Sequence, residues 1–139
     1  MDGQVTAGML VCAIPKRTIV IWLTKRLATF SLALVGTALE FLKSDMRPAD
    51  VYQFECRVEE IVRELARSVE EWCFNALEPQ KVESMALQVE YEGQVYRRLK
   101  HKTPHAQILT RFGNITLTRA TYRLGGRGRT IAPLEIALG

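Results

Sequence analysis

Most side chains that could do chemistry are cations near the C-terminal end of the chain. Residues 95 to 139 contain nine lysines and arginines and a single acid, Glu135. Clustered cations release counterions when they meet a row of phosphates, and this release favours binding to a polyanion. The sequence therefore predicts contact with a nucleic-acid backbone, made by Arg97, Arg98, Lys100, Lys102, Arg111, Arg119, Arg123, Arg127 and Arg129.

Two groups of these arginines have a spacing that suits DNA. Arg119 and Arg123 lie four residues apart in a segment of strand character, so they fall on one face of an extended strand. The glycine-rich segment 127 to 129 (Arg-Gly-Arg), when extended, places two guanidinium groups along a minor groove. A flexible, solvated turn is the favoured interpretation of that segment, because Thr130 stands in place of the proline typical of such minor-groove hooks.

The sequence contains no pattern typical of a metal or catalytic site. His101 and His105 have the spacing of metal ligands on a helix, but Thr103-Pro104 between them disfavours a helix. The phosphate-binding pattern G-x-x-x-x-G-K-S/T and the nucleophile pattern G-x-S-x-G are both absent. We therefore expect no metal, no cofactor and no catalytic residue in this chain.

Length and composition limit the class of protein. The chain has 139 residues, of which 47% are hydrophobic and 24% charged, which excludes a long multidomain enzyme and global disorder. Its three cysteines, Cys12, Cys56 and Cys73, form an odd set without C-x-x-C spacing, so no disulfide framework is encoded. A reduced, cytoplasmic location fits this cysteine pattern best.

The basic end has the alternation of β-strands. Apolar and polar residues alternate from 87 to 99 around Gly93, which predicts a β-hairpin. Gly113-Asn114 separates two further strand-like runs, and this pair is typical of a two-residue hairpin turn. We expect one continuous strand from Ile115 to Leu124 after that turn.

Two helices are expected to precede the strands. Asp50, with Gln53 three residues later, predicts an N-cap for an amphipathic helix that runs to about residue 77. This helix belongs to an acidic segment, residues 40 to 94, in which 13 acids face six cations. Acids repel phosphates, so we assign the helix to scaffolding or self-association rather than to DNA contact.

Residues 18 to 42 are apolar enough to suggest a membrane segment. Lys25 and Arg26 interrupt them, however, and the uncharged stretch from Leu27 to Leu39 is shorter than the ~20 residues that a span needs. A helix that is buried or packed against a partner is the favoured interpretation, because large apolar residues recur at three- and four-residue steps. A segment without an evolved role, added by an upstream start codon, is a further alternative.

These patterns predict an α+β fold, with two N-terminal amphipathic helices followed by a small antiparallel β-hairpin region. Three parts follow from the changes in composition: an apolar helical segment over 1–43, an acidic helix within 44–80 and a basic β region over 81–139.

Several short motifs resemble a run near the N-terminus of bacterial insertion-sequence transposases. In that family the run is similar to T-x-F-G-x-(V/I)-x-(V/L)-x-R-x-x-Y, followed by a short insert and P-L-D-x-x-L. The similarity covers roughly residues 50 to 139, although Glu135 replaces the usual Asp and the insert at 124–130 lacks the paired cysteines of some relatives. The residues that carry the resemblance are Glu90-Tyr91-Glu92-Gly93, Tyr96-Arg97-Arg98, Thr110-Arg111-Phe112-Gly113-Asn114-Ile115, Arg119, Tyr122-Arg123, Pro133-Leu134-Glu135 and Leu138-Gly139.

The resemblance implies a transposase of the metal-dependent DDE type, whose N-terminal region recognises element ends or helps assembly and whose catalytic domain is RNase H-like. No residue here matches the family's catalytic acids. We therefore expect an N-terminal portion or truncated remnant that binds double-stranded DNA and is not itself an enzyme. Two alternatives remain: a structural module that forms a homo-oligomer without binding DNA, and a weaker one in which the apolar N-terminus anchors the chain at a membrane surface.

Overall fold

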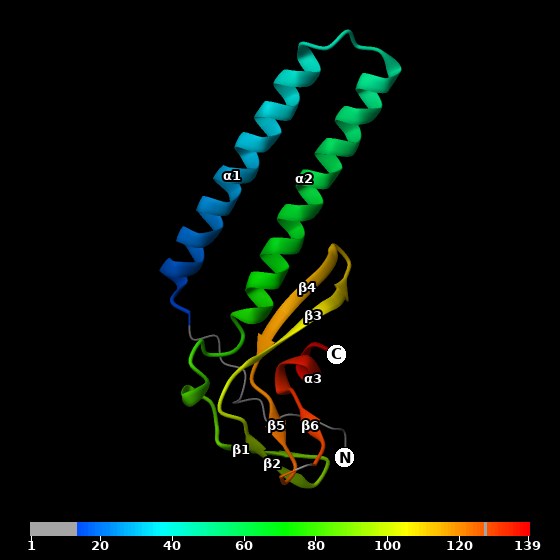
Figure 1. The fold of residues 1–139 in the computed structure, drawn as a ribbon. Coiled ribbons are helices and arrows are strands. Elements are labelled where there is room, and N and C mark those ends of the chain that lie inside the picture. Colours follow the sequence, from blue (N-terminus) through cyan, green and yellow to red (C-terminus); the bar gives the residue numbers. More distant parts are fainter. Residues whose placement is uncertain (1–13, 127) are drawn as a thin grey trace. The chain divides into compact units, whose positions relative to one another are not determined.

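The computed structural model describes residues 14–126 and 128–139, and it has the predicted α+β fold. Two long helices are followed by antiparallel strands in two small sheets (Figure 1). The chain forms two compact units. The helical unit comprises Pro15–Glu70 and Leu109–Ile115, and the sheet unit includes Glu71–Ile108 and Thr116–Gly139.

The helical unit is built on an antiparallel pair, helix α1 (Lys16–Leu42) and the greater part of helix α2 (Pro48–Asn75) (Figure 1). Phe41 and Phe54 stack across the pair with ring centroids 4.3 Å apart, which fixes the closed end of the helical hairpin. The rings lie one on each helix, close to the connection between them.

The start of α2 differs from the prediction. Pro48 is the first helical residue, where its missing N–H costs no hydrogen bond. Asp50 therefore lies in the first turn rather than at the N-cap, and its Oδ2 accepts a hydrogen bond from the Arg47 N–H at 3.1 Å. The predicted N-cap was wrong by three residues because the proline, and not the carboxylate, sets the first turn.

Helix α1 is hardly covered by the rest of the described chain. Of its residues, Thr37 alone is buried. Among the described residues, α1 is the one helix long and apolar enough to cross a membrane, a criterion that rests on length and composition only. Burial of this helix within the chain is thus contradicted, whereas packing against a partner stays a prediction.

The sheet unit contains a four-stranded antiparallel sheet in the order β1-β2-β5-β6. The predicted hairpin around Gly93 is confirmed, with Glu92 and Gly93 at φ angles of 51° and 76°. Two successive positive φ angles are those of a type I′ turn, which suits the twist of the flanking strands. The strands are β1 (Gln88–Tyr91), β2 (Gln94–Arg98), β5 (Tyr122–Arg123) and β6 (Thr130–Ile131).

One face of this sheet forms the core of the unit. Alternation along each strand sends every second side chain to that face. Tyr96 and Tyr122 are both completely buried there, so the two rings anchor the middle strands. The cluster includes Val82 from a 3-10 turn (Val82–Ser84) and, in full, Val82, Met85, Val89, Tyr96, Ala120, Tyr122 and Ile131.

The second hairpin differs from its prediction at the turn. Strands β3 (Thr103–Thr110) and β4 (Gly113–Arg119) pair, and the turn residues are Arg111 and Phe112 rather than Gly113 and Asn114. The Thr110 hydroxyl donates to the Gly113 carbonyl at 2.8 Å, which closes the turn two residues earlier than expected. Gly113 still supplies a positive φ, of 124°, as the first residue of the returning strand.

The predicted strand from residue 115 to 124 is interrupted. Strand β4 ends at Arg119 and β5 begins at Tyr122 in the other sheet. Polar side chains from the end of α2 and just beyond accept hydrogen bonds from alternate N–H groups of this segment, in place of a neighbouring strand. Glu71 Oε2 accepts from Thr116 at 2.9 Å, Asn75 Oδ1 from Thr118 at 2.8 Å and Glu78 Oε1 from Ala120 at 2.9 Å.

Candidate nucleic-acid interface

The outward face of the four-stranded sheet carries a continuous polar row. The register pairs Gln88 with Arg97, Arg97 with Arg123, and Arg123 with Thr130. Directly paired residues point to the same face of a sheet, so these four side chains form one line across all four strands. We call this line, Gln88, Arg97, Arg123 and Thr130, the arginine row.

Two like charges lie side by side at the centre of the arginine row. Cβ atoms of directly paired residues are about 4.5–5.5 Å apart, and like charges at that spacing destabilise a sheet. Arg97 is exposed and has no hydrogen bond or ion pair within the described parts of the chain. Among the residues that the structure describes, Arg123 donates only to the Gly126 carbonyl, at 3.3 Å. The two guanidinium groups can therefore bind one anionic group between them.

Other predicted cations support the fold instead. The Arg98 guanidinium turns toward the core side of the sheet and donates to the Met85 carbonyl. The Lys102 side chain is only 13% exposed, and its Nζ lies 3.8 Å from Glu78 Oε1. Both groups are thereby withdrawn from a partner in solution.

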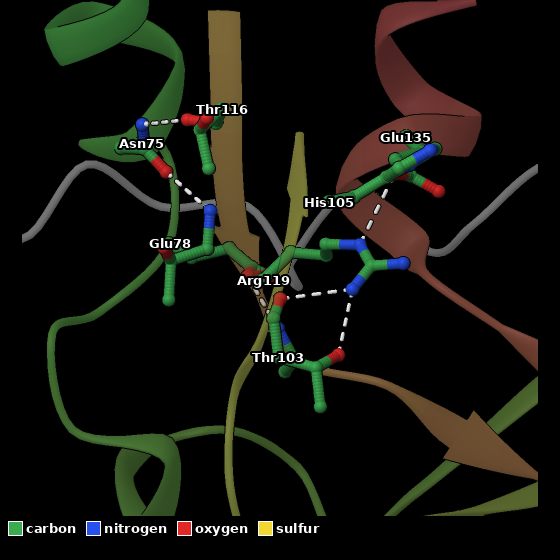
Figure 2. A network of polar contacts seen from close by, with 9 residues as sticks. Asn75, Glu78, Thr103, His105, Thr116, Arg119 and Glu135 are labelled. Atoms are coloured by element: carbon green, nitrogen blue, oxygen red, sulfur yellow. Dashed lines mark hydrogen bonds and ion pairs between the residues drawn. The ribbon is translucent and has the colours of Figure 1, made fainter. Parts of the chain in front are cut away.

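Arg119 is the centre of a polar network that fastens strand β4 to helix α3 (Pro133–Leu138). Its Nε donates to Glu135 Oε1 at 3.1 Å, and its Nη1 donates to the carbonyl and hydroxyl oxygens of Thr103 at 2.8 and 2.6 Å (Figure 2). His105 Nδ1 contacts the same Glu135 oxygen. With only 14% of its side chain exposed, Arg119 serves as a structural residue here.

The remaining four cations have different surroundings. Lys100 is exposed just beyond β2. Arg129 forms an exposed ion pair with Glu92 at 3.2 Å, and its guanidinium lies 5.9 Å from the centre of the Tyr91 ring. Arg111 is exposed on the β3–β4 turn, which belongs to the helical unit. Arg127 lies outside the described residues.

Glu78, the last of the three side chains that accept hydrogen bonds from residues 116 to 120, is buried. Glu78 is 2% exposed, and its Oε2 has no hydrogen-bond partner within the described residues. Burial raises the pKa of Glu78 above its ordinary value, while the Ala120 N–H and the charges of Lys102 and Arg119 partly oppose that rise. The acidic helix was expected to serve in scaffolding or self-association, and the hydrogen bonds from its polar side chains to a strand were not predicted.

A signal for those residues exists in the sequence. Glu71, Asn75 and Glu78 have the i, i+4, i+7 spacing that places side chains on one helix face. No such spacing in the sequence indicates that Gln88 and Thr130 belong to the arginine row, because their places in it depend on how separate strands pair.

The described residues offer no metal centre, since no group of three or more histidines, cysteines or acids among them is placed to hold an ion. His105 contacts Glu135, whereas His101 is exposed on the β2–β3 connection. The two histidines are therefore engaged differently.

Comparison with known proteins finds no family model, no curated protein and no solved structure that matches this chain. The resemblance to insertion-sequence transposases thus stays a prediction that rests on its motifs alone.

Proposed function

We propose that this chain is the N-terminal portion or a remnant of an insertion-sequence transposase, and that it binds the backbone of double-stranded DNA. In this proposal the arginine row holds phosphate groups, and Lys100 adds a further charge. The chain takes part in DNA recognition or assembly during transposition and has no strand-cleavage activity of its own.

The paired charges of Arg97 and Arg123 carry this proposal. A directly opposed pair of like charges costs a sheet about 0.2–1 kcal/mol relative to neutral residues. A bound phosphate offsets that repulsion, because both guanidinium groups can then donate charge-assisted hydrogen bonds to the same anion. The flanking Gln88 and Thr130 add neutral donors of the kind that often contact phosphate and sugar oxygens.

Fewer cations contact phosphate in this proposal than the nine predicted from the sequence. Three cations, Arg97, Lys100 and Arg123, are the best-placed phosphate ligands, with Arg129 available once it leaves Glu92. Arg98, Lys102 and Arg119 contribute to stability. Contacts of this kind position a protein on DNA without reading sequence, so the same affinity is expected for unrelated duplexes.

The test compares two doubly substituted chains by fluorescence anisotropy with a labelled duplex. The first carries Arg97→Gln and Arg123→Gln. The control carries Arg57→Gln and Arg63→Gln on α2, where both arginines are exposed and ion-paired with glutamates. Each double variant lowers the formal charge of +4 by the same amount. Any difference between them therefore reports position rather than total charge.

We expect the first variant to bind about 10-fold or more weakly than the wild type, as the loss of two phosphate contacts implies. The control should stay within about 2-fold of the wild type, because α2 is assigned no phosphate contact. Equal losses in the two variants would contradict the assignment of the site to the sheet.

A further inference from the structure

Helix α1 presents a largely apolar stripe that the described part of the chain leaves uncovered and that has the spacing of a coiled coil. Starting at Ile21, seam positions follow at alternating steps of four and three residues, which is the heptad pattern of helices that pack along one line. The most exposed large apolar members are Leu32, Leu42 and Val35, at 74%, 66% and 55%. We call this stripe the α1 seam; it comprises Ile21, Lys25, Ala28, Leu32, Val35, Leu39 and Leu42.

The Thr29 hydroxyl, beside the seam, already has a hydrogen-bond acceptor within the helix. It donates to the Lys25 carbonyl at 3.1 Å. This hydroxyl can enter an interface without leaving a donor unsatisfied. Between Leu27 and Leu39 the helix carries no charge, so about 20 Å of its length is free to pack against an apolar surface.

We propose that the α1 seam binds the same seam of a second copy of this chain, with the two helices antiparallel. The spacing of the seam is nearly symmetric about Leu32, which would lie at the twofold axis and meet its own counterpart. Ala28 then faces Val35 of the second copy, so that a small residue meets a larger one. The same symmetry sets Ile21 opposite Leu42 of the second copy and Lys25 opposite Leu39.

Charge favours the antiparallel arrangement over the parallel one. Lys25 and Glu40 lie at nearly equal distances on either side of Leu32, and both are exposed. Neither forms an ion pair within the described residues. An antiparallel pair places Lys25 beside Glu40 of the second copy, and does so twice. A parallel pair would set Lys25 against Lys25 and leave each glutamate about 22 Å away along the axis.

The charges of α2 favour a protein partner over a bilayer. Four ionisable side chains of α2, Arg57, Glu60, Arg63 and Glu64, line one groove together with Phe30 and Ala33 of α1. A membrane-spanning α1 would carry these groups into hydrocarbon, where each charge costs several kcal/mol. A second copy covers the seam without moving them.

The first experiment measures the mass of the full chain in solution by light scattering across a concentration series. We expect the wild type to have twice the chain mass of 15.8 kDa at high concentration. Val35→Lys should raise the dimer dissociation constant on the order of 100-fold, because two lysines enter the uncharged part of the seam between Leu27 and Leu39. The matched control is Val62→Lys on α2, a valine of nearly equal exposure, 51%, outside the seam.

Orientation is tested by exchanging the charges. Lys25→Glu should weaken the dimer. Lys25→Glu combined with Glu40→Lys should restore the dissociation constant to within about 3-fold of the wild-type value. The swap recreates the ion pair only when the helices are antiparallel. A chain that stays monomeric at all concentrations, an equal effect of the two valine substitutions, or a failure of the charge swap would overturn the proposal. Binding of the monomeric wild type to vesicles of neutral phosphatidylcholine would likewise overturn it and identify the bilayer as the occupant.

Discussion

Replacing Arg97 by Gln should make the protein more stable, although the change removes a proposed DNA contact. In the structure Arg97 lies directly opposite Arg123 and has no acidic partner among the described residues. Two unit charges roughly 7 Å apart in water repel by about 0.6 kcal/mol. Glutamine keeps most of the length of the side chain and removes this repulsion, so the free energy of unfolding should rise by about 0.5 kcal/mol.

Urea denaturation followed by circular dichroism measures this gain. With a slope of about 1.5 kcal/mol per molar urea, the midpoint should rise by about 0.3 M at low salt. The gain should nearly vanish in about 1 M salt, where charges are screened within about 3 Å. Arg57→Gln is the control, because it loses an exposed ion pair with Glu60 and should leave stability unchanged or slightly lower. A midpoint that falls on Arg97→Gln, or a gain that does not depend on salt, would refute the reasoning.

Further predictions concern the elements that hold the sheet unit together. Burial raises the pKa of Glu78, so the folded state retains a proton that the unfolded chain releases. The free energy of unfolding should therefore fall as pH rises above the ordinary pKa of 4.5. Thermal melts in a pH series should show a weaker fall for Glu78→Gln. Asn75→Ala removes the acceptor for the Thr118 N–H and the donor to the Thr116 carbonyl, which should cost about 2–3 kcal/mol and speed amide hydrogen exchange at Thr118. Gly93→Val places a branched side chain at a φ of 76° in the type I′ turn and should lower stability by about 1–2 kcal/mol in urea titrations.

The helices and the first hairpin could be predicted because their signals are local. Apolar residues at three- and four-residue steps define α2 over most of its length, and Glu92-Gly93 between two alternating runs defines the β1–β2 hairpin. These patterns act within a few residues of where they occur, so the chain alone carries them.

Two features escaped the prediction, one because it depends on a distant group and the other because a local side-chain hydrogen bond moves a turn. The break between β4 and β5 is stabilised by the Glu78 carboxylate, which accepts from the Ala120 N–H across 42 positions of sequence. The shift of the β3–β4 turn depends on the Thr110 hydroxyl, which closes a turn that the Gly113-Asn114 pair was expected to form.

The candidate site could be predicted in kind but not in detail. The excess of cations in residues 95 to 139 is visible in the sequence. The pairing of Arg97 with Arg123 is not, because it depends on the register of a two-residue strand. Nor does the sequence reveal that Arg119 is held by Thr103 and Glu135 instead of facing outward with Arg123.

The most direct test of the DNA-binding account is the salt dependence of duplex affinity for the full chain, measured by anisotropy between about 50 and 200 mM salt. With Arg97, Lys100 and Arg123 as the phosphate contacts, the logarithm of the association constant should fall against the logarithm of salt concentration with a slope near −3. Arg97→Gln with Arg123→Gln should reduce the slope to about −1. A slope near zero for the wild type, or an unchanged slope for the double variant, would contradict the account.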